Sequence, residues 1–219
     1  NALQDYKRVV KQRNETLRAH QMRSESPADL ELWDMQLVEL GSRIVQKRQS
    51  VVLELEREAQ SLHGAISDDK EELCVTYKSS FEFGKVDDVK AAFIEALARS
   101  EREERSRGLT VVGPHRDDLI LTMNGVNLSA YGSQGQHKTA ATAIKLSEAL
   151  FLLHKTHSPP LLLLDDIFAE LDALRTTRLI ELLPVFGQVF ITAAKESDIG
   201  AHGDRFRRFN VHAGQVTRM

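Results

Sequence analysis

The sequence predicts an α/β protein in two parts, a mainly helical, coiled-coil-like hairpin over residues 1–107 and an α/β domain over residues 108–219. In the first part, charged residues surround apolar residues that lie three, four or seven positions apart. In the second part, strand-like and helical segments alternate, which is typical of a parallel sheet with crossover connections. The composition changes between the two parts at Gly108.

Composition limits the classes of function. The chain has 219 residues, of which 42% are hydrophobic, enough for one large or two small cores. No apolar run approaches the roughly 20 residues that a membrane-spanning helix needs, so we expect no membrane contact. The single cysteine, Cys74, excludes an internal disulfide and indicates a reducing, cytoplasmic location. With a net charge of -3, DNA binding would require a local basic patch.

A long helix is predicted to begin near Pro27, where Ser26 is suited to cap it and Pro27 to occupy its first position. A shorter helix precedes it, and a break is expected over residues 64–69. The charges of this hairpin are interpreted as a solvated surface. Its apolar stripe consists of Leu30, Trp33, Leu37, Leu40, Ile44, Val51, Leu55 and Leu62.

The following segments alternate between the two types of element. A helix is expected to bury Val89, Phe93, Ile94 and Leu97, and Asn124-Gly125 favours a tight hairpin turn. Later helices are predicted over residues 135–154 and 173–183. The predicted strands cover residues 73–77, 109–112, 119–123, 126–128, 161–164, 189–192, 206–211 and 215–219.

The strongest candidate for chemistry is an apolar strand that ends in two carboxylates, Asp165 and Asp166. A strand that is apolar on both faces belongs inside a parallel sheet, and open α/β sheets bind ligands at the carboxyl ends of such strands. In phosphoryl transfer, one carboxylate at this position holds Mg²⁺ and a neighbour orients the attacking water, the Walker B arrangement. The structural alternative is a strand end followed by an acidic helix cap.

Residues 133–136 stand at the start of the predicted helix over residues 135–154. Free backbone N–H groups and the helix dipole make such a start a site for anions. Gly135 permits close approach of the backbone, and Ser133 and Gln136 add polar side chains. Plain helix capping explains the same residues. Their position upstream of Asp165 and Asp166 favours nucleotide chemistry.

A phosphate-wrapping P-loop is missing from the sequence. Residues 132–139 end in Lys138-Thr139, but a Walker A motif has Gly directly before the Lys, and His137 stands there. We therefore expect this chain alone to bind ATP weakly and not to turn it over.

Together these segments resemble the RecF family of recombination mediators, which are relatives of the SMC and Rad50 ABC-type ATPases. The resemblance is carried by residues 113–119, 131–136, 161–166, 170–172 and 188–192, and it extends upstream through residues 5–14 and 33–34. It implies a helical arm over residues 1–107, followed by the carboxyl-terminal lobe of an ABC-type ATPase head with its signature and Walker B motifs. Such a head binds ATP and Mg²⁺ and forms a homodimer. The dimer clamps DNA at single-strand/double-strand junctions for recombinase loading, together with RecR and RecO mediators.

The resemblance also implies a role for each matching residue. Asp165 would hold Mg²⁺, Asp166 would act as the catalytic residue that positions water, and Thr192 would occupy the switch position. The signature, which would face the γ-phosphate bound to the opposite protomer, consists of Ser133, Gln134, Gly135 and Gln136. The D-loop at the dimer contact consists of Glu170, Leu171 and Asp172.

Two departures from the pattern matter. Asp166 replaces the Glu that is usual in ABC ATPases, and its shorter reach implies slow hydrolysis by the full-length dimer. Ala193 and Ala194 follow Thr192, where more hydroxyl side chains are expected.

Two basic segments leave alternatives open. His115 and Arg116 are suited to meet phosphate, but a structural turn with Arg116 paired to Asp117 or Asp118 explains residues 113–119 equally well. For Arg205, Arg207 and Arg208, a soluble edge strand is favoured over DNA contact.

Two other functions are compatible with parts of this pattern. A structural or interaction arm that never binds nucleotide has no need of the paired Asp165 and Asp166 beside residues 133–136. An ABC transporter ATPase predicts a short helical insert and a His at the switch, so Thr192 and the long arm argue against it.

Overall fold

The computed structural model describes residues 1–22, 28–168, 171–195 and 205–219. Contacts divide the chain into two compact units. Unit 1 comprises residues 1–53 and 76–120, and unit 2 comprises residues 54–75 and 121–219. The domain boundary expected between residues 107 and 108 stays a prediction.

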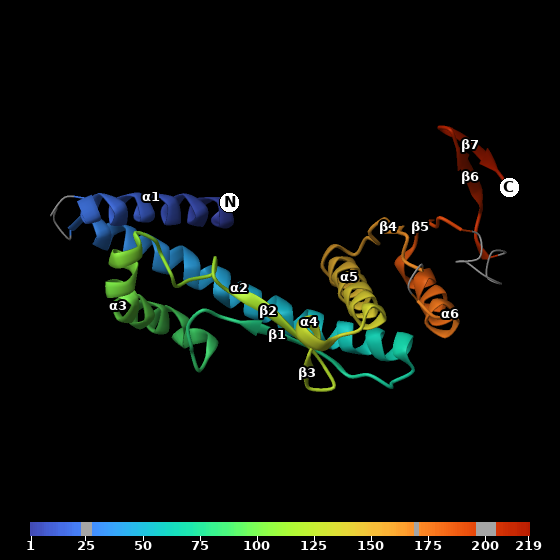
Figure 1. Cartoon of the computed structure of the whole chain (residues 1–219), viewed down its shortest axis with the longest axis horizontal. Helices are drawn as coiled ribbons and strands as arrows, with labels where there is room; N and C mark the ends of the chain where they lie inside the picture. The colour runs from blue at the N-terminus through green and yellow to red at the C-terminus, as the bar shows by residue number, and fades with distance from the viewer. Residues whose placement is uncertain (23–27, 169–170, 196–204) are drawn as a thin grey trace. The chain divides into compact units, whose positions relative to one another are not determined.

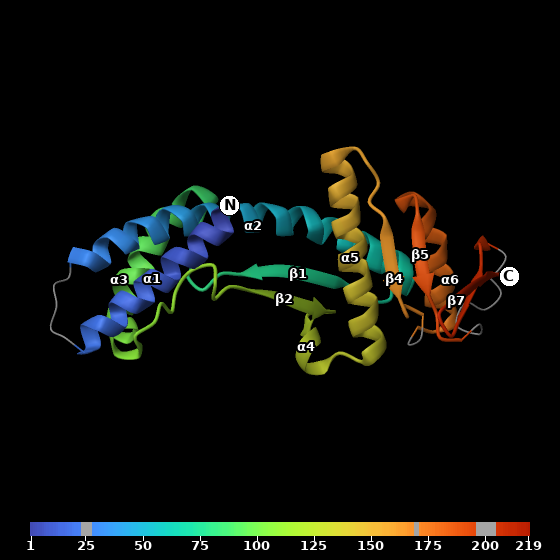
Figure 2. The same ribbon diagram turned by 90° about the horizontal axis from the view of Figure 1, so that it is seen from above.

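Unit 1 is built from α1 (Ala2–Met22), the first part of α2 (Ala28–Ser67) and α3 (Val89–Arg107), which a 3₁₀ turn (Val86–Asp88) precedes. In Figures 1 and 2, α1 and α3 lie beside α2. The predicted pair of helices is confirmed, and the expected cap at Ser26 and Pro27 lies outside the described residues. The helices enclose a core of Tyr6, Val9, Leu37, Val38, Ile44, Val45, Phe81, Val89, Phe93, Ala96, Leu97 and Val112.

Two helical details differ from the sequence prediction. The break expected over residues 64–69 begins only at Asp68 and Asp69, whose φ angles are 66° and 53°. Burial of Leu62 and Ile66 keeps the last turn of α2 helical and outweighs the roughly 1 kcal/mol that Gly64 costs in a helix. Ile94, expected to be buried, is 52% exposed because it lies next to the fully buried Phe93 on a neighbouring face of α3.

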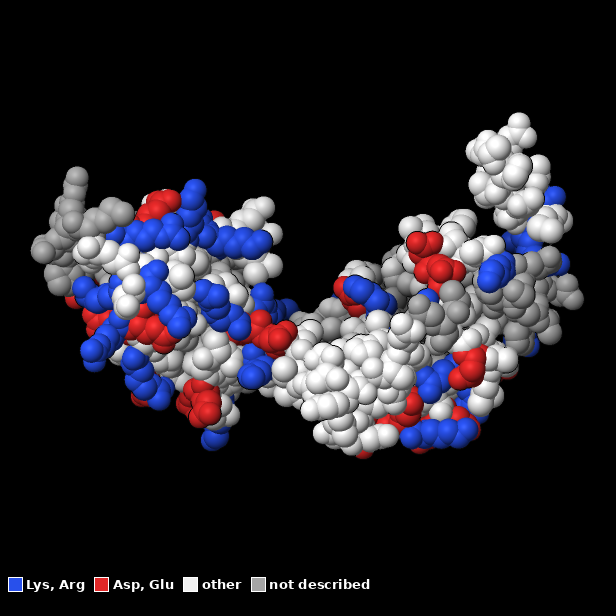
Figure 3. Space-filling view, viewed as in Figure 1, with Lys and Arg blue, Asp and Glu red and all other residues white. Residues whose placement is uncertain are grey.

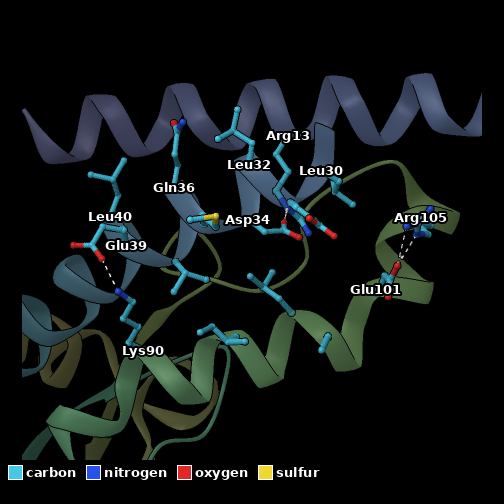
Figure 4. A pocket seen from close by; sticks show the side chains of 16 residues that line it. Arg13, Leu30, Leu32, Asp34, Gln36, Glu39, Leu40, Lys90, Glu101 and Arg105 are labelled. Atoms are coloured by element: carbon cyan, nitrogen blue, oxygen red, sulfur yellow. Dashed lines mark hydrogen bonds and ion pairs between the residues drawn. The ribbon is translucent and has the colours of Figure 1, made fainter. Parts of the chain in front are cut away.

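Ile94 lines a groove of about 990 Å³ between α2 and α3 (Figure 4). Exposed apolar side chains from both helices, Leu32 and Met35 among them, form much of its surface. Two ion pairs lie along it, Lys90 with Glu39 and Arg105 with Glu101.

A three-stranded sheet has the order β1 (Leu73–Lys78), β2 (Asp118–Met123), β3 (Val126–Asn127). β2 and β3 form the predicted antiparallel hairpin, and its turn residues Asn124 and Gly125 have φ angles of 51° and 77°. The short helix α4 (Leu128–Tyr131) follows.

The strand predicted over residues 109–112 is wrong. The backbone N–H of Thr110 donates to Asn14 Oδ1 at 2.7 Å, and that of Val111 donates to Glu104 Oε1 at 2.8 Å. Side-chain acceptors therefore take the bonds that a neighbouring strand would take, and periodicity cannot show this.

Unit 2 contains the predicted α/β alternation: α5 (Gln134–Thr156), β4 (Leu162–Asp165), α6 (Ala173–Leu182), a 3₁₀ turn (Leu183–Phe186) and β5 (Val189–Thr192). β4 and β5 pair in parallel, as expected for a crossover connection. In Figure 2, α5 and α6 lie next to this sheet. A terminal antiparallel pair follows, β6 (Phe209–His212) and β7 (Gln215–Arg218). Within the ranges given above, no helix is long and apolar enough to cross a membrane.

Candidate functional site

The carboxyl ends of β4 and β5 bring together the two predicted carboxylates and the predicted switch residue. In the parallel register, Asp165 lies opposite Thr192. Thr192 Oγ1 donates a hydrogen bond to Asp165 Oδ1. The backbone N–H of Asp166 donates to the carbonyl oxygen of Thr192 at 3.2 Å and lies 3.1 Å from its hydroxyl. Asp165, Asp166 and Thr192 therefore form one cluster.

Asp166 has a left-handed backbone with a φ angle of 47°. Asp and Asn adopt this conformation more readily than longer side chains do. The side chain of Asp166 is exposed, while its carbonyl oxygen accepts a hydrogen bond from Lys138 Nζ at 2.9 Å. The backbone of Asp166 is thus held from β5 and from α5. Its conformation gives a physical reason for Asp where Glu was expected.

The start of α5 forms a capping box. Ser133 Oγ accepts from the backbone N–H of Gln136 at 3.2 Å, and Gln136 Oε1 accepts from the backbone N–H of Ser133 at 2.9 Å. The helix turn that they begin includes Gln134 and Gly135, whose N–H groups lie too early in the helix for an intrahelical acceptor. This 23-residue helix therefore presents backbone donors at its amino end, where its dipole favours an anion.

A half-buried ion network joins the start of α5 to the start of α6. Gln136 Nε2 donates to Glu71 Oε1 at 3.0 Å, and Arg175 Nη2 donates to Glu71 Oε2 at 3.1 Å. Arg175 also lies 3.3 Å from Asp172, through Nε and Oδ2. Asp172 caps α6 by accepting from the backbone N–H of Arg175 at 2.9 Å. The predicted signature and D-loop segments are therefore linked through Glu71 and Arg175.

Three residues of this arrangement, Lys138, Arg175 and Glu71, were not predicted from the sequence. Lys138 was considered only as part of a false P-loop, and its contact with Asp166 depends on the tertiary fold. Arg175 carried a signal, because it follows Asp172 by three positions on a predicted helix. Glu71 carried none. Of the predicted D-loop, Leu171 and Asp172 are described, and Glu170 lies outside the described residues.

The segment 113–119 belongs to unit 1 and forms a turn that is held by hydrogen bonds. Gly113 has a φ angle of 124°, and its N–H donates to Ser80 Oγ at 2.8 Å. Asp117 accepts from the backbone N–H of Ser80 at 2.7 Å and from Tyr77. Arg116 donates to the carbonyl oxygen of Thr110. These bonds support a structural turn, but Arg116 donates to Thr110 and Asp117 accepts from Tyr77 and Ser80, so the pairing expected between Arg116 and Asp117 or Asp118 is replaced by other partners.

The two exposed carboxylates at the end of β4 can supply only some of the ligands that a divalent cation needs. Mg²⁺ keeps several waters and takes one or two carboxylates in phosphoryl-transfer sites, so Asp165 and Asp166 fit its preferences. Among the residues that the structure describes, no group of three or more His, Cys, Asp or Glu is arranged to hold a metal alone. The remaining ligands would have to come from water and phosphate.

One face of β4 is open. Leu163 is 72% exposed, and Leu161 and Phe190 are also exposed. A groove of about 440 Å³ lies between β4 and α5 and is lined mainly by apolar side chains. Such strands normally lie inside a sheet.

No family model matches the chain, but individual relatives do. It is 38% identical to the DNA replication and repair protein RecF of Halothermothrix orenii, over 99% of this chain and 59% of the relative. It is 39% identical to the RecF of a Synechocystis species, over 98% of this chain and 59% of that protein. The chain thus spans a little over half the length of these curated relatives.

Solved structures give the same result. A structure described as the recombination mediator protein RecF with ATP, in the RecFOR pathway, superposes with a TM-score of 0.81. The identity is 29%, and the match covers 100% of this chain and 57% of the other. Both the sequence and the mixed helix and sheet fold therefore show that the chain belongs to the RecF family.

Proposed function

We propose that the protein is an ATP-dependent DNA clamp of recombinational repair, and that this chain supplies the carboxyl-terminal part of its ATPase. Residues 1–107 would form the arm, and residues 108–219 the head lobe with the signature and Walker B motifs. The observation that carries the proposal is the cluster of Asp165, Asp166 and Thr192 at the carboxyl ends of two parallel strands. This is where open α/β sheets bind their ligands.

Asp165 and Asp166 would divide the chemistry. Asp165, oriented by Thr192, would hold Mg²⁺, which neutralises charge on the phosphates when it is bound. Asp166 would position the attacking water with its exposed carboxylate, since Thr192 and Lys138 hold its backbone in place. As the switch residue, Thr192 would couple nucleotide binding at the site to the segment that follows β5.

The amino end of α5 would act on a second copy of the protein. Its backbone donors, capped by Ser133 and Gln136, suit the γ-phosphate of a nucleotide on the facing protomer. The D-loop, with Leu171 and Asp172 and with Glu170 outside the described residues, would lie at the contact between the two heads. This supports a homodimer that closes only with ATP.

The open face of β4 supports a head that is completed by further sequence. Exposed Leu161, Leu163 and Phe190 need apolar cover, and the curated relatives are longer than this chain. We expect the phosphate-wrapping loop that this chain lacks to come from that additional sequence.

DNA contact would use a local basic surface. Figure 3 shows Lys and Arg side chains over α1, where Lys7, Arg8, Lys11 and Arg18 are exposed. Such a surface attracts phosphates despite the net charge of -3. The RecFOR description of the solved neighbour suggests RecO and RecR as partners.

The proposal is tested by Asp166→Asn in the full-length protein. We expect ATP binding and ATP-dependent dimerisation to persist, while hydrolysis slows by about a hundredfold or more, because the amide cannot orient water as the carboxylate does. Asn also tolerates the left-handed backbone of this position. Binding is measured by equilibrium dialysis and hydrolysis by phosphate release.

Asp165→Asn is the comparison, and it should weaken Mg²⁺-dependent ATP binding as well. If Asp166→Asn hydrolysed ATP at the normal rate, the assignment of Asp166 would be wrong. If the unaltered protein bound no ATP, a purely structural arm would be the better description.

A further inference from the structure

Arg175 uses all three nitrogens of its guanidinium to connect separate segments of unit 2. Nη1 donates to Thr139 Oγ1 at 2.9 Å, Nη2 donates to Glu71 Oε2 at 3.1 Å, and Nε lies 3.3 Å from Asp172 Oδ2. Its side chain is only 20% exposed. A planar fork with fixed donor directions holds its acceptors at fixed relative positions, which a lysine cannot do.

Each acceptor leads to one of the segments proposed to meet at the dimer contact. The hydroxyl of Thr139 donates to the carbonyl oxygen of Gly135 at 2.8 Å, inside the first turn of α5. Glu71 also binds the side chain of Gln136. Asp172 is the cap of α6 and ends the D-loop segment.

We propose that Arg175 is a positioning residue that fixes the distance between the signature and the D-loop, with Glu71 as its bridge to Gln136. The inference rests on the proposed function, because it assumes that both segments face a second protomer. Two segments that must bind one partner at the same time do so best when they are already held in the right relation. Arg175 itself touches neither nucleotide nor reacting atoms in this scheme.

The chain offers a matched control on the same helix. Arg178 donates to the carbonyl oxygen of Ala65 at 3.2 Å and to Asp68 Oδ1, so it ties α6 to the end of α2. Neither of these partners lies in α5, whereas Arg175 contacts Thr139 of α5 directly and Gln136 by way of Glu71. Arg175→Lys and Arg178→Lys are therefore the same substitution about one turn apart on α6. Only Arg175→Lys alters the connection to the signature.

The experiment measures ATP affinity, ATP-dependent dimerisation by sedimentation, and thermal stability of the full-length protein. For Arg175→Lys we expect ATP affinity within about twofold of normal, but dimerisation and turnover lowered by about tenfold or more, because the two segments are misplaced. Arg178→Lys should lower the melting temperature similarly and leave dimerisation intact.

A second pair of variants tests whether the connection is one unit. Glu71→Gln should lower dimerisation as Arg175→Lys does, and the double variant should be little worse than either alone. Equal dimerisation by Arg175→Lys and Arg178→Lys, or additive effects of the Glu71 and Arg175 variants, would overturn the proposal.

A readout without nucleotide separates this inference from the proposed function. Hydrogen exchange at the amides of residues 136–138 should speed up in Arg175→Lys and not in Arg178→Lys. If the unaltered protein fails to dimerise with ATP but exchange shows this difference, the proposed function fails while the positioning by Arg175 stands. Unchanged exchange in both variants removes the positioning role itself.

Discussion

Each unit contains an arginine that uses all three nitrogens, and the two networks differ in burial. In unit 1, Arg13 donates to Asp34, Thr110 and Glu104 at 2.5, 2.9 and 2.6 Å, and its side chain is 2% exposed. In unit 2, the contacts of Arg175 are 2.9 to 3.3 Å long and its side chain is 20% exposed. The arginine of unit 1 is therefore almost fully buried and makes the shorter contacts, whereas the arginine of unit 2 is partly exposed and makes the longer ones.

The difference in burial indicates different roles for the networks of Arg13 and Arg175. Burial lowers the pKa of Arg13, but its hydrogen bond to Glu104 and the charge of Asp34 outweigh that effect and raise the pKa. Arg13 therefore stays charged inside unit 1, and it joins three segments that are far apart in sequence. A buried network that is fully paired makes one arrangement strongly preferred. The partly exposed network around Arg175 suits segments that, under the proposed function, would engage a second protomer.

The largest effect is expected when Arg13 loses its buried partner. Glu104→Ala removes the fully buried one of the two carboxylates that pair with Arg13 and leaves the N–H of Val111 without its acceptor. We expect unit 1 to lose about 3 to 5 kcal/mol of stability. Urea unfolding followed by the fluorescence of Trp33, the only tryptophan, measures this in unit 1.

Glu103→Ala is the matched control. Glu103 pairs with Arg107 on the exposed face of α3, and such pairs contribute little. An equal loss of stability in both variants would show that burial does not distinguish the two ion pairs.

A smaller effect is expected in unit 2. Glu71→Ala removes the acceptor of Arg175 and of Gln136, and we expect a loss of about 1.5 to 3 kcal/mol, as for hydrogen bonds to charged groups. Because water reaches this network, added salt should reduce the loss, whereas the Glu104→Ala loss should hardly change. Hydrogen exchange of the α5 amides measures the loss of stability caused by Glu71→Ala. The comparison of the two networks fails if salt affects both losses equally.

The sequence was sufficient for features that depend on local pattern. The pair of helices, the Asn124-Gly125 hairpin and the parallel β4 and β5 were all predicted, because periodicity and turn chemistry are local. The strand over residues 109–112 failed because Asn14 and Glu104, distant in sequence, take its backbone N–H groups. For the same reason, the contact of Lys138 with Asp166 and the bridge through Glu71 were not predictable.

The smallest effect concerns pH, and it again separates the two units. His63 is fully buried in unit 2, with Nδ1 3.2 Å from the carbonyl oxygen of Glu71 and Nε2 3.9 Å from its carboxylate. Burial lowers the pKa of His63, and the charge of Arg175 lowers it further, while Glu71 opposes the shift. The folded protein therefore holds His63 neutral at a pH where the unfolded chain begins to bind a proton.

Stability should accordingly fall as the pH drops below about 6.5, the usual pKa of histidine, because the unfolded state gains protons that the folded state does not. His63→Gln removes this titration, so the slope of unit 2 stability against pH should flatten between about pH 7 and about pH 5. Exchange of the α5 amides at several pH values, corrected for intrinsic rates, measures that slope. His115→Gln in unit 1, where burial also lowers the pKa of the histidine, should leave it unchanged. An unaltered slope in His63→Gln would mean that other groups cause the acid sensitivity of unit 2.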